Sequence, residues 1–264
     1  MKICTLYSGS GGNATFISAG GANILIDAGK NARMLCNALG EIGVSPDSID
    51  AIFITHEHSD HISALEVFLK KHPTPVHVSE VSAKKLLARS CAHLDDCLVL
   101  HPPIFTEEVK GLKISSFVTP HDSMGSVGYR LSFFEGDALR EIGIATDIGY
   151  VSDAVLKGLE GCESIVVESN HDVDMLKSGS YPYDLKMRIL SKRGHLANPD
   201  CALLLTRLCQ SGTKNILLAH LSEENNDPET AYDEAYSAIS DPSVRLAVAS
   251  PCEVTRLVWE EEAC

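Results

Sequence analysis

Short apolar runs and amphipathic stretches alternate along the chain, and this pattern predicts an α/β arrangement. Apolar runs rich in β-forming residues, several of them bounded by Gly-rich loops, predict strands over 2–6, 14–18, 23–26, 51–55, 76–78, 112–118, 127–134, 141–146, 164–168, 215–219, 245–249 and 253–259. Apolar residues at helical spacing predict helices over 31–41, 62–71, 82–89, 152–159, 202–209 and 228–239. Because no Pro/Ser-rich linker interrupts the alternation, we expect one α/β domain over residues 1–264, with sheets inside and helices outside.

Composition narrows the class of protein. The chain has 264 residues, of which 44% are hydrophobic, which is enough to build a sizeable core. A formal net charge of −14 argues against a broad, non-specific grip on nucleic acid or anionic membrane, because such binding needs Lys and Arg. No apolar run approaches the length of a membrane helix, and we find no signal peptide. The nine cysteines form no C-x-x-C pair, so we expect free thiols, a cytoplasmic location and no membrane partner.

Three imidazoles and a carboxylate are concentrated between His56 and His61, in the pattern His-x-His-x-Asp-His. Imidazole and carboxylate groups are the usual ligands of zinc, iron and manganese. A predicted strand precedes this segment and a predicted helix follows it, so it forms a strand-to-helix loop, where rigid elements can hold ligands in place. Ser59 or Asp60 is expected to cap the helix, and this structural role competes with metal binding for Asp60.

Four further strands end in side chains that commonly bind metal. These are Asp27, His121, Asp147 and His220, each directly after an apolar run or within two residues of one. Taken singly, an Asp near a Gly is often part of a turn, and a lone His is more often part of a hydrogen-bonded structure. Four such positions in a chain that already contains the His-x-His-x-Asp-His segment favour a metal site.

The order of these residues resembles the five motifs of the metallo-β-lactamase superfamily, from Asp27 to His220. The resemblance implies a four-layer αββα sandwich, with two divalent metal ions at one edge of the sheets. It implies that one ion is held by His56, His58 and His121. It implies that the other is held by Asp60, His61 and His220, that Asp147 bridges both, and that Asp27 orients ligands from behind.

Ligand identity narrows the branch of the superfamily. Flavodiiron proteins of this fold normally have Glu in place of His58, and zinc β-lactamases typically have Cys in place of Asp147. The ligand set of this chain therefore disfavours both of these branches. The segments that begin at Glu168 and Gly194 resemble the loops of RNase Z-like enzymes in which a His lies beside the scissile phosphate. Together with the loops at 8–13 and 218–226, they resemble the YycJ/WalJ family, which is associated with DNA exonuclease activity.

The resemblance leads to a hypothesis of metal-dependent phosphodiester hydrolysis with DNA as the substrate. Zinc, manganese and iron all suit the donor set, Asp60 is a candidate proton acceptor, and His195 supported by Glu168 is a candidate hydrogen-bond or proton donor. One alternative is a small-molecule hydrolase, either a cyclic phosphodiesterase or a glyoxalase II-like thioesterase. Another is a non-catalytic scaffold, which the full ligand set disfavours. His171 either lines the cleft or contacts metal, and we leave it outside the ligand set.

A basic run lies just before His195 and consists of Lys186, Arg188, Lys192 and Arg193. It suits either a phosphate backbone or an ordinary solvated helix face. Tyr181 and Tyr183 could stack on bases, although we expect both to pack in the core. We expect the remaining histidines to be structural or exposed: His72, His77, His93 and His101.

Overall fold

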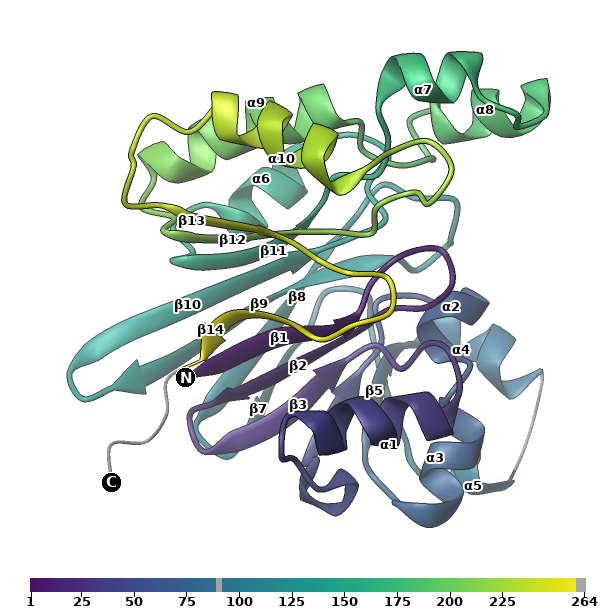
Figure 1. The fold of residues 1–264 in the computed structure, drawn as a ribbon. Coiled ribbons are helices and arrows are strands. Elements are labelled where there is room, and N and C mark those ends of the chain that lie inside the picture. Colours follow the sequence, from purple (N-terminus) through teal and green to yellow (C-terminus); the bar gives the residue numbers. More distant parts are fainter. Residues whose placement is uncertain (89–91, 260–264) are drawn as a thin grey trace.

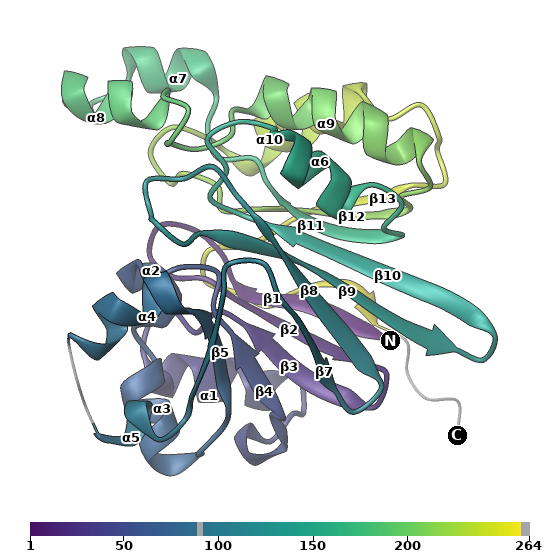
Figure 2. The same cartoon turned by 180° about the vertical axis from the view of Figure 1, so that it is seen from behind.

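The computed structural model describes residues 1–88 and 92–259, and within them two sheets pack face to face between two layers of helices (Figures 1 and 2). Sheet one has the order β14 (Thr255–Trp259), β1 (Lys2–Tyr7), β2 (Ala14–Ala19), β3 (Ala22–Ile26), β4 (Ala51–Phe53), β5 (Val76–Ser79), β6 (Leu98–His101). Sheet two has the order β13 (Arg245–Val248), β12 (Asn215–Ala219), β11 (Ser164–Glu168), β10 (Ala138–Ala145), β9 (Val127–Glu135), β8 (Leu112–Val118), β7 (Thr106–Val109).

Each sheet carries helices on its outer side, and one helical pair projects beyond the sandwich. On the side of sheet one lie α1 (Ala32–Glu41), the short 3₁₀ helix η1 (Pro46–Ser48), α2 (Ser59–Ile62), α3 (Leu65–Lys71), α4 (Glu80–Leu87) and α5 (Ala92–Asp95). On the side of sheet two lie α6 (Asp153–Leu159), α9 (Asn198–Gln210) and α10 (Pro228–Ser237). The pair α7 (Val173–Ser178) and α8 (Tyr183–Ile189) extends past one end of the sheets (Figure 1). The predicted αββα sandwich is therefore confirmed.

Three apolar layers hold the sandwich together. The middle layer joins the inner faces of both sheets, for example through Phe53 from sheet one and Tyr129 from sheet two. The outer layers bury the apolar faces of the helices, such as Leu35 of α1 and Leu205 of α9. Tyr129 also donates its hydroxyl hydrogen to the carbonyl oxygen of Ile54 over 2.6 Å, which satisfies a buried polar group between the sheets.

The strand directions bring the candidate residues to one edge of the sandwich. Strands β3 and β4 are parallel in sheet one, and β10, β11 and β12 are parallel in sheet two. Strand β8 runs in the same direction as β10, because both are antiparallel to β9. Side chains that follow these strands therefore meet where the carboxyl ends of the two sheets lie together.

The predicted helix over 62–71 is found as α3, but it begins at Leu65, because the residues before it form a separate short helix, α2, that ends at Ile62. The carbonyl oxygen of Asp60 accepts a hydrogen bond from Asn13 N, and the N–H of Ala64 donates to Ala28 O. These bonds replace the Ala64-to-Asp60 bond that a continuous helix would make. The expected cap at Ser59 or Asp60 is wrong, since His58 is the capping residue and makes no side-chain capping bond.

The other differences concern elements with weak apolar patterns. The sequence did not predict β6, β7, α5, α7 or α8, all of which are short and only partly buried. Helix α9 begins at Asn198, ahead of the predicted 202, because Pro199 suits the first turn of a helix. The predicted end of the 82–89 helix lies outside the described residues, as do Cys91 and Cys264. No helix within 1–88 or 92–259 is both long enough and apolar enough to cross a bilayer.

Gly29 is required where the loop after β3 passes over α2. A Cβ atom at Gly29 would lie 1.9 Å from Asp60 O and 2.5 Å from Asn13 N, both backbone atoms that hold the loop. We predict that Gly29→Ala lowers the free energy of unfolding by about 1–3 kcal/mol, as overpacking does, in denaturant titrations. The matched control is Gly40→Ala in α1, where a Cβ meets no atom within 4 Å and a helical Ala adds up to about 1 kcal/mol. Equal stability of Gly29→Ala and the wild type would contradict this packing argument.

Candidate metal centre

Three of the candidate side chains leave their strands through left-handed backbone. Asp27, Asp147 and His220 have φ values of 63°, 55° and 57°, a region that non-glycine residues rarely adopt. Such positions cost about 1–3 kcal/mol each and persist where the surrounding structure enforces them, which is common at functional sites. The turns therefore direct these side chains into the space between the two sheets.

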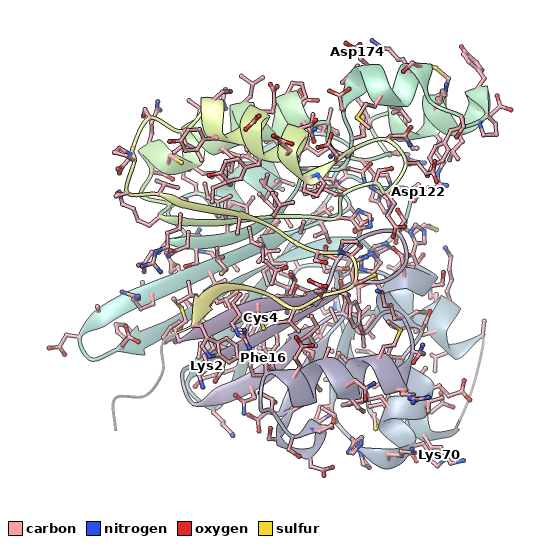
Figure 3. The ribbon with its side chains drawn as sticks, in the orientation of Figure 1. Lys2, Cys4, Phe16, Lys70, Asp122 and Asp174 are labelled. Atoms are coloured by element: carbon pink, nitrogen blue, oxygen red, sulfur yellow. The ribbon has the colours of Figure 1, made fainter. Side chains whose placement is uncertain are left out.

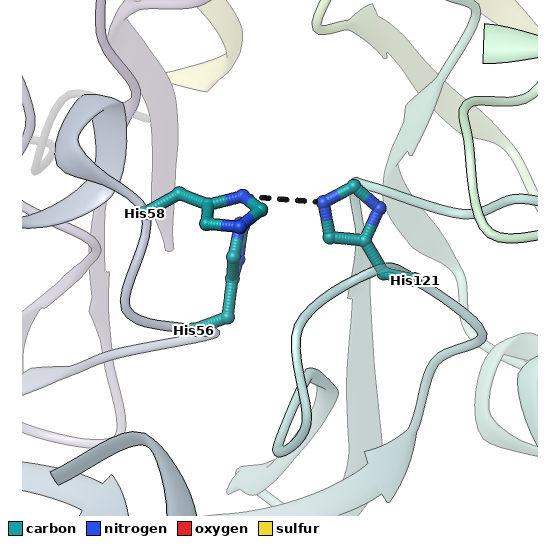
Figure 4. A group of neighbouring side chains, drawn as sticks. All are labelled: His56, His58 and His121. Atoms are coloured by element: carbon teal, nitrogen blue, oxygen red, sulfur yellow. Dashed lines mark hydrogen bonds between the residues drawn. The ribbon is translucent and has the colours of Figure 1, made fainter. Parts of the chain in front are cut away.

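His56, His58 and His121 form the first group of ligand atoms (Figure 4). One nitrogen of each ring lies within 4.8 Å of the others, and His58 Nδ1 lies 3.3 Å from His121 Nε2. Burial, reinforced by neighbouring histidines, lowers the pKa of His56 well below its usual value, and burial also lowers that of His58. Both rings are therefore neutral at neutral pH, which is the form that binds metal.

Asp60, His61 and His220 form the second group, also within 4.8 Å of one another. The Oδ2 atom of Asp60 lies 3.2 Å from His61 Nε2 and 3.6 Å from His220 Nε2. Asp147 lies between the two groups, with Oδ2 at 3.3 Å from His61 Nε2 and Oδ1 at 3.7 Å from His121 Nε2. The structure thus brings together all seven side chains that the sequence predicted as ligands.

The buried atoms of this cluster fit a divalent cation. His56 Nε2, Asp147 Oδ2 and His220 Nε2 are buried, and none has a hydrogen-bond partner. Leaving such atoms unpaired costs about 1–3 kcal/mol each, and their convergence on one space suits a cation that accepts the lone pairs of the nitrogens and of the carboxylate oxygen. Imidazole and carboxylate donors in two groups that share Asp147 suit zinc, manganese or iron.

Four of the five histidines also have a partner for the ring nitrogen that faces away from the centre, and such partners fix ring orientation at metal sites. The pairs are His56 Nδ1 with Thr55 Oγ1 (3.1 Å), His61 Nδ1 with Asp27 Oδ2 (2.7 Å), His121 Nδ1 with Gly194 O (3.1 Å) and His220 Nδ1 with Glu168 Oε1 (2.9 Å). Asp27 therefore contacts His61 from behind, as the resemblance implied. It also accepts hydrogen bonds from the backbone and side chain of Thr55.

Buried Glu168 pairs with partly exposed His195 at the edge of the centre. Glu168 Oε1 lies 2.8 Å from His195 Nδ1, and Oε2 accepts hydrogen bonds from the backbone of Ile148 and Leu196. Burial alone would raise the pKa of Glu168, but the neighbouring His195 and His220 hold it at about 2. Glu168 is thus an anion that can orient His195.

A cavity of about 220 Å³ opens over the centre. Its lining includes Asp60, Asp147, His195 and His220 on the metal side, and Leu185, Arg188 and Ile189 from α8. His171 does not line this cavity and belongs to neither ligand group, so it stays outside the candidate ligand set. A molecule bound in the cavity would contact the candidate ligands and α8 together.

The expectation that Tyr181 and Tyr183 pack in the core is wrong. Tyr181 lines the cavity and is only partly buried, and Tyr183 is 74% exposed, because α8 lies beyond the sandwich.

The basic run is divided between two environments. Lys186 Nζ donates to the carbonyl oxygens of Lys177 and Gly179, whereas Arg188 lines the cavity.

Sequence reasoning missed Asn13 as a contact of the centre. Its Nδ2 atom lies 3.3 Å from Asp60 Oδ2 and 3.2 Å from His61 Nε2. The Gly-rich loop at 8–13 is part of the resemblance to the YycJ/WalJ family, but that resemblance gave Asn13 no role at the centre. The loop reaches the centre because Gly29 N bonds Asn13 O, and Asn13 N bonds Asp60 O.

A second cluster of ligand atoms, away from the cavity, comprises His77, His101 and Glu107. Here His77 Nδ1 lies 2.9 Å from His101 Nε2, and the two rings are within 12° of parallel with centroids 5.2 Å apart. This is the geometry of two nearly coplanar rings that share one proton in a hydrogen bond. Burial lowers the pKa of His77 to about 4, so this ring is neutral at neutral pH and its Nδ1 is engaged with His101.

Comparison with known proteins places this geometry in a family. The sequence profile of the metallo-β-lactamase superfamily matches residues 7–139. The chain is 37% identical over 236 residues to exodeoxyribonuclease WalJ of Streptococcus pneumoniae, covering 88% of this chain and 86% of that protein. The chain belongs to the metallo-β-lactamase superfamily. Within the superfamily it groups with WalJ and YycJ, since it is 34% identical to exodeoxyribonuclease YycJ of Bacillus anthracis, with 88% and 86% of the two chains covered.

Solved structures of the superfamily share the fold. The metallo-β-lactamase fold protein YhfI from Bacillus subtilis superposes with a TM-score of 0.74 at 16% identity, covering 97% of this chain and 98% of that one. The short form of human tRNase Z superposes with a TM-score of 0.66 at 17% identity, covering 98% of this chain and 100% of that one. Superfamily membership implies a metal-dependent hydrolase, and the His and Asp cluster provides the donors for divalent metal binding.

Metal binding is predicted to release protons at neutral pH. Burial alone would lower the pKa of both His61 and His220, but Asp27 and Asp147 raise that of His61 well above its usual value. Asp147, Asp60 and Glu168 raise that of His220 to about 10. Each imidazole therefore carries a proton that it must lose to coordinate a cation, so affinity increases as pH rises.

Calorimetric titration of the metal-free protein with Zn²⁺, in buffers of different ionisation enthalpy, measures this release. We expect the apparent enthalpy to depend on the buffer, with one proton from each of His61 and His220. His72→Ala should release the same number, because His72 pairs with Asp47 away from the centre. An enthalpy that is identical in all buffers would contradict the protonation states inferred here.

Proposed function

We propose that the chain is a dinuclear metal-dependent phosphodiesterase that acts as a DNA exonuclease. The observation that carries the proposal is the pair of ligand groups sharing Asp147 beneath a cavity that also contains His195. The names of the relatives support the reaction, since both WalJ and YycJ are exodeoxyribonucleases and match over 88% of this chain. Two-metal sites of this kind suit in-line displacement at phosphorus.

In this proposal His56, His58 and His121 would hold the first ion, and Asp60, His61 and His220 would hold the second. Asp147, which lies between the two groups, would contribute to both sites, and Asp27 would keep His61 in the orientation that binding requires. The bound ions would supply Lewis-acid stabilisation of the phosphoryl charge and would lower the pKa of water. Zinc, manganese and iron remain candidates, because this mixed donor set accepts all three.

Asp60 is proposed to accept a proton from the attacking water. Its carboxylate lines the cavity, and although burial favours the neutral form, the neighbouring His220 and His61 hold its pKa below the usual value. Asp60 is therefore an anion at neutral pH, with one face toward the ligand groups and another toward the cavity. These properties suit a proton acceptor at the reacting centre.

His195 is proposed to assist departure of the leaving oxygen. Glu168 lies at hydrogen-bond distance from Nδ1 of His195, which leaves the other ring nitrogen for a molecule in the cavity. The carboxylate of Glu168 holds the ring so that its other nitrogen can give a proton or a hydrogen bond to the leaving oxygen. Glu168 also faces His220, so the same anion connects the proton donor to the proposed second metal site.

DNA is proposed to approach from the side of α8. Tyr181 and Arg188 line the cavity, and they offer an aromatic face for a base and a cation for a phosphate. A net charge of −14 restricts such attraction to this local surface.

We further propose a cytoplasmic location, supported by the seven cysteines within the described residues, which are all free thiols.

We predict that the metal-reconstituted protein removes label progressively from the ends of duplex DNA. Asp60→Ala should abolish digestion, because it removes both a metal ligand and the proton acceptor. His195→Ala should slow digestion about 100-fold or more, the usual loss for a missing acid–base group. The measurement is the rate of label release in Mn²⁺, Zn²⁺ or Fe²⁺, with His72→Ala as a control that should match the wild type.

The same assay separates the alternatives. No digestion with any of these metals, together with turnover of a cyclic phosphodiester or a thioester, would replace the nuclease proposal with a small-molecule hydrolase. Metal uptake without turnover of any ester would support a scaffold.

A further inference from the structure

His58 differs from the other histidines of the centre in its surroundings. Its side chain is 30% exposed, whereas His56, His61, His121 and His220 are buried. The outward nitrogens of those four rings have hydrogen-bond partners, but the Nε2 atom of His58 has none in this geometry. The carboxylate facing it is that of Asp122, with Oδ1 at 3.5 Å from His58 Nε2.

One oxygen of the Asp122 carboxylate is hydrogen-bonded, and the other has no hydrogen-bond partner. Its Oδ2 accepts a hydrogen bond from Nε of Arg188 over 2.7 Å and lies 2.6 Å from Nη2 of the same guanidinium. Its Oδ1 is buried and has no hydrogen-bond partner, although it lies 3.1 Å from His121 Nε2. Figure 3 shows Asp122 at the end of the sandwich, below the projecting α7 and α8.

When metal is bound, Oδ1 of Asp122 has one hydrogen-bond donor available to it. His121 Nδ1 lies 3.1 Å from Gly194 O, so its Nε2 is the nitrogen left for the metal and then carries no hydrogen. His58 directs Nδ1 toward His121 and the first ligand group, so its Nε2 carries the hydrogen. An N–H of a ligating His that points at a carboxylate is the usual means of fixing the ring at a metal site.

We propose that Asp122 and Arg188 are positioning residues for the first metal site, a proposal that rests on the metal-dependent function above. Asp122 accepts the Nε2 hydrogen of His58, and Arg188 holds Asp122 in place. Because Arg188 lies on α8 and also lines the cavity, the pair connects the projecting helices to the first ligand group. His58 is the ligand that needs such support, since the core does not enclose it.

The test is the affinity of each metal site, measured by titrating metal-free protein with Zn²⁺ against a chromophoric chelator. Asp122→Ala should weaken one of the two binding constants about 10- to 100-fold, the usual loss when such a partner is removed, and leave the other unchanged. Asp122→Asn keeps an acceptor oxygen and should recover part of the loss. The matched control is Glu141→Ala, which removes a carboxylate from the Arg130 pair on β9 and β10, away from the cavity.

Arg188 is tested by a double-mutant cycle in the same titration. Arg188→Ala should weaken the same constant as Asp122→Ala, and the double variant should be no weaker than Asp122→Ala alone, because Arg188 acts through Asp122. Arg188→Lys should restore part of the affinity. Additive losses would show that Arg188 acts independently and would overturn the connection to α8.

The outcomes separate this inference from the proposed function. If Asp122→Ala and Asp122→Asn both keep the two wild-type constants, or lose affinity equally at both sites, the positioning role is overturned. The exonuclease proposal survives those results. A wild-type protein that binds no metal at all would instead overturn the proposed function.

Discussion

The docking of α2 onto the loops of sheet one is the interaction on which the candidate centre depends. Asp60 O accepts from Asn13 N, His61 O accepts from Ala28 N, and Ala64 N donates to Ala28 O. These bonds end α2 after one turn and fix its direction relative to the sheet. Asp60 and His61 are thereby held against the ends of strands that come from other parts of the chain.

The same docking explains how so many titratable groups are buried together. Five imidazoles and several carboxylates occupy the space between the sheet ends, where acidic neighbours raise the pKa of His61 and His220 and so keep these rings protonated. Several buried atoms of the cluster have no hydrogen-bond partner, including Asp147 Oδ2. A bound cation would replace protons on His61 and His220 and would satisfy these atoms. The packing at this edge of the sandwich therefore favours metal binding.

The sequence was sufficient for the features that follow from local pattern. Buried strands such as β12 and β3 are continuous apolar runs, so their ends, and therefore Asp27 and His220, could be located from the chain alone. Parallel strands bring such ends to one edge, and the resemblance to the metallo-β-lactamase superfamily supplied the grouping of ligands. The αββα sandwich and family membership are confirmed, whereas the catalytic roles remain proposals.

What the sequence did not predict depends on contacts between distant segments. The break between α2 and α3 results from Asn13 and Ala28, which lie more than one element away, so helical spacing over 62–71 could not indicate it. The exposure of Tyr183 follows from the projection of α8, and an apolar pattern cannot distinguish a projecting helix from a packed one. The contact between Asp122 and Arg188 joins residues 66 positions apart and leaves no local signal.

The most direct test of the account is anomalous diffraction from crystals of the protein loaded with Mn²⁺ or Zn²⁺. The account predicts two anomalous peaks about 3.5–4 Å apart, as in two-metal hydrolytic sites. One should be ligated by His56, His58 and His121, and the other by Asp60, His61 and His220, with Asp147 between them. A single peak, or peaks away from the ends of β4, β8, β10 and β12, would contradict it.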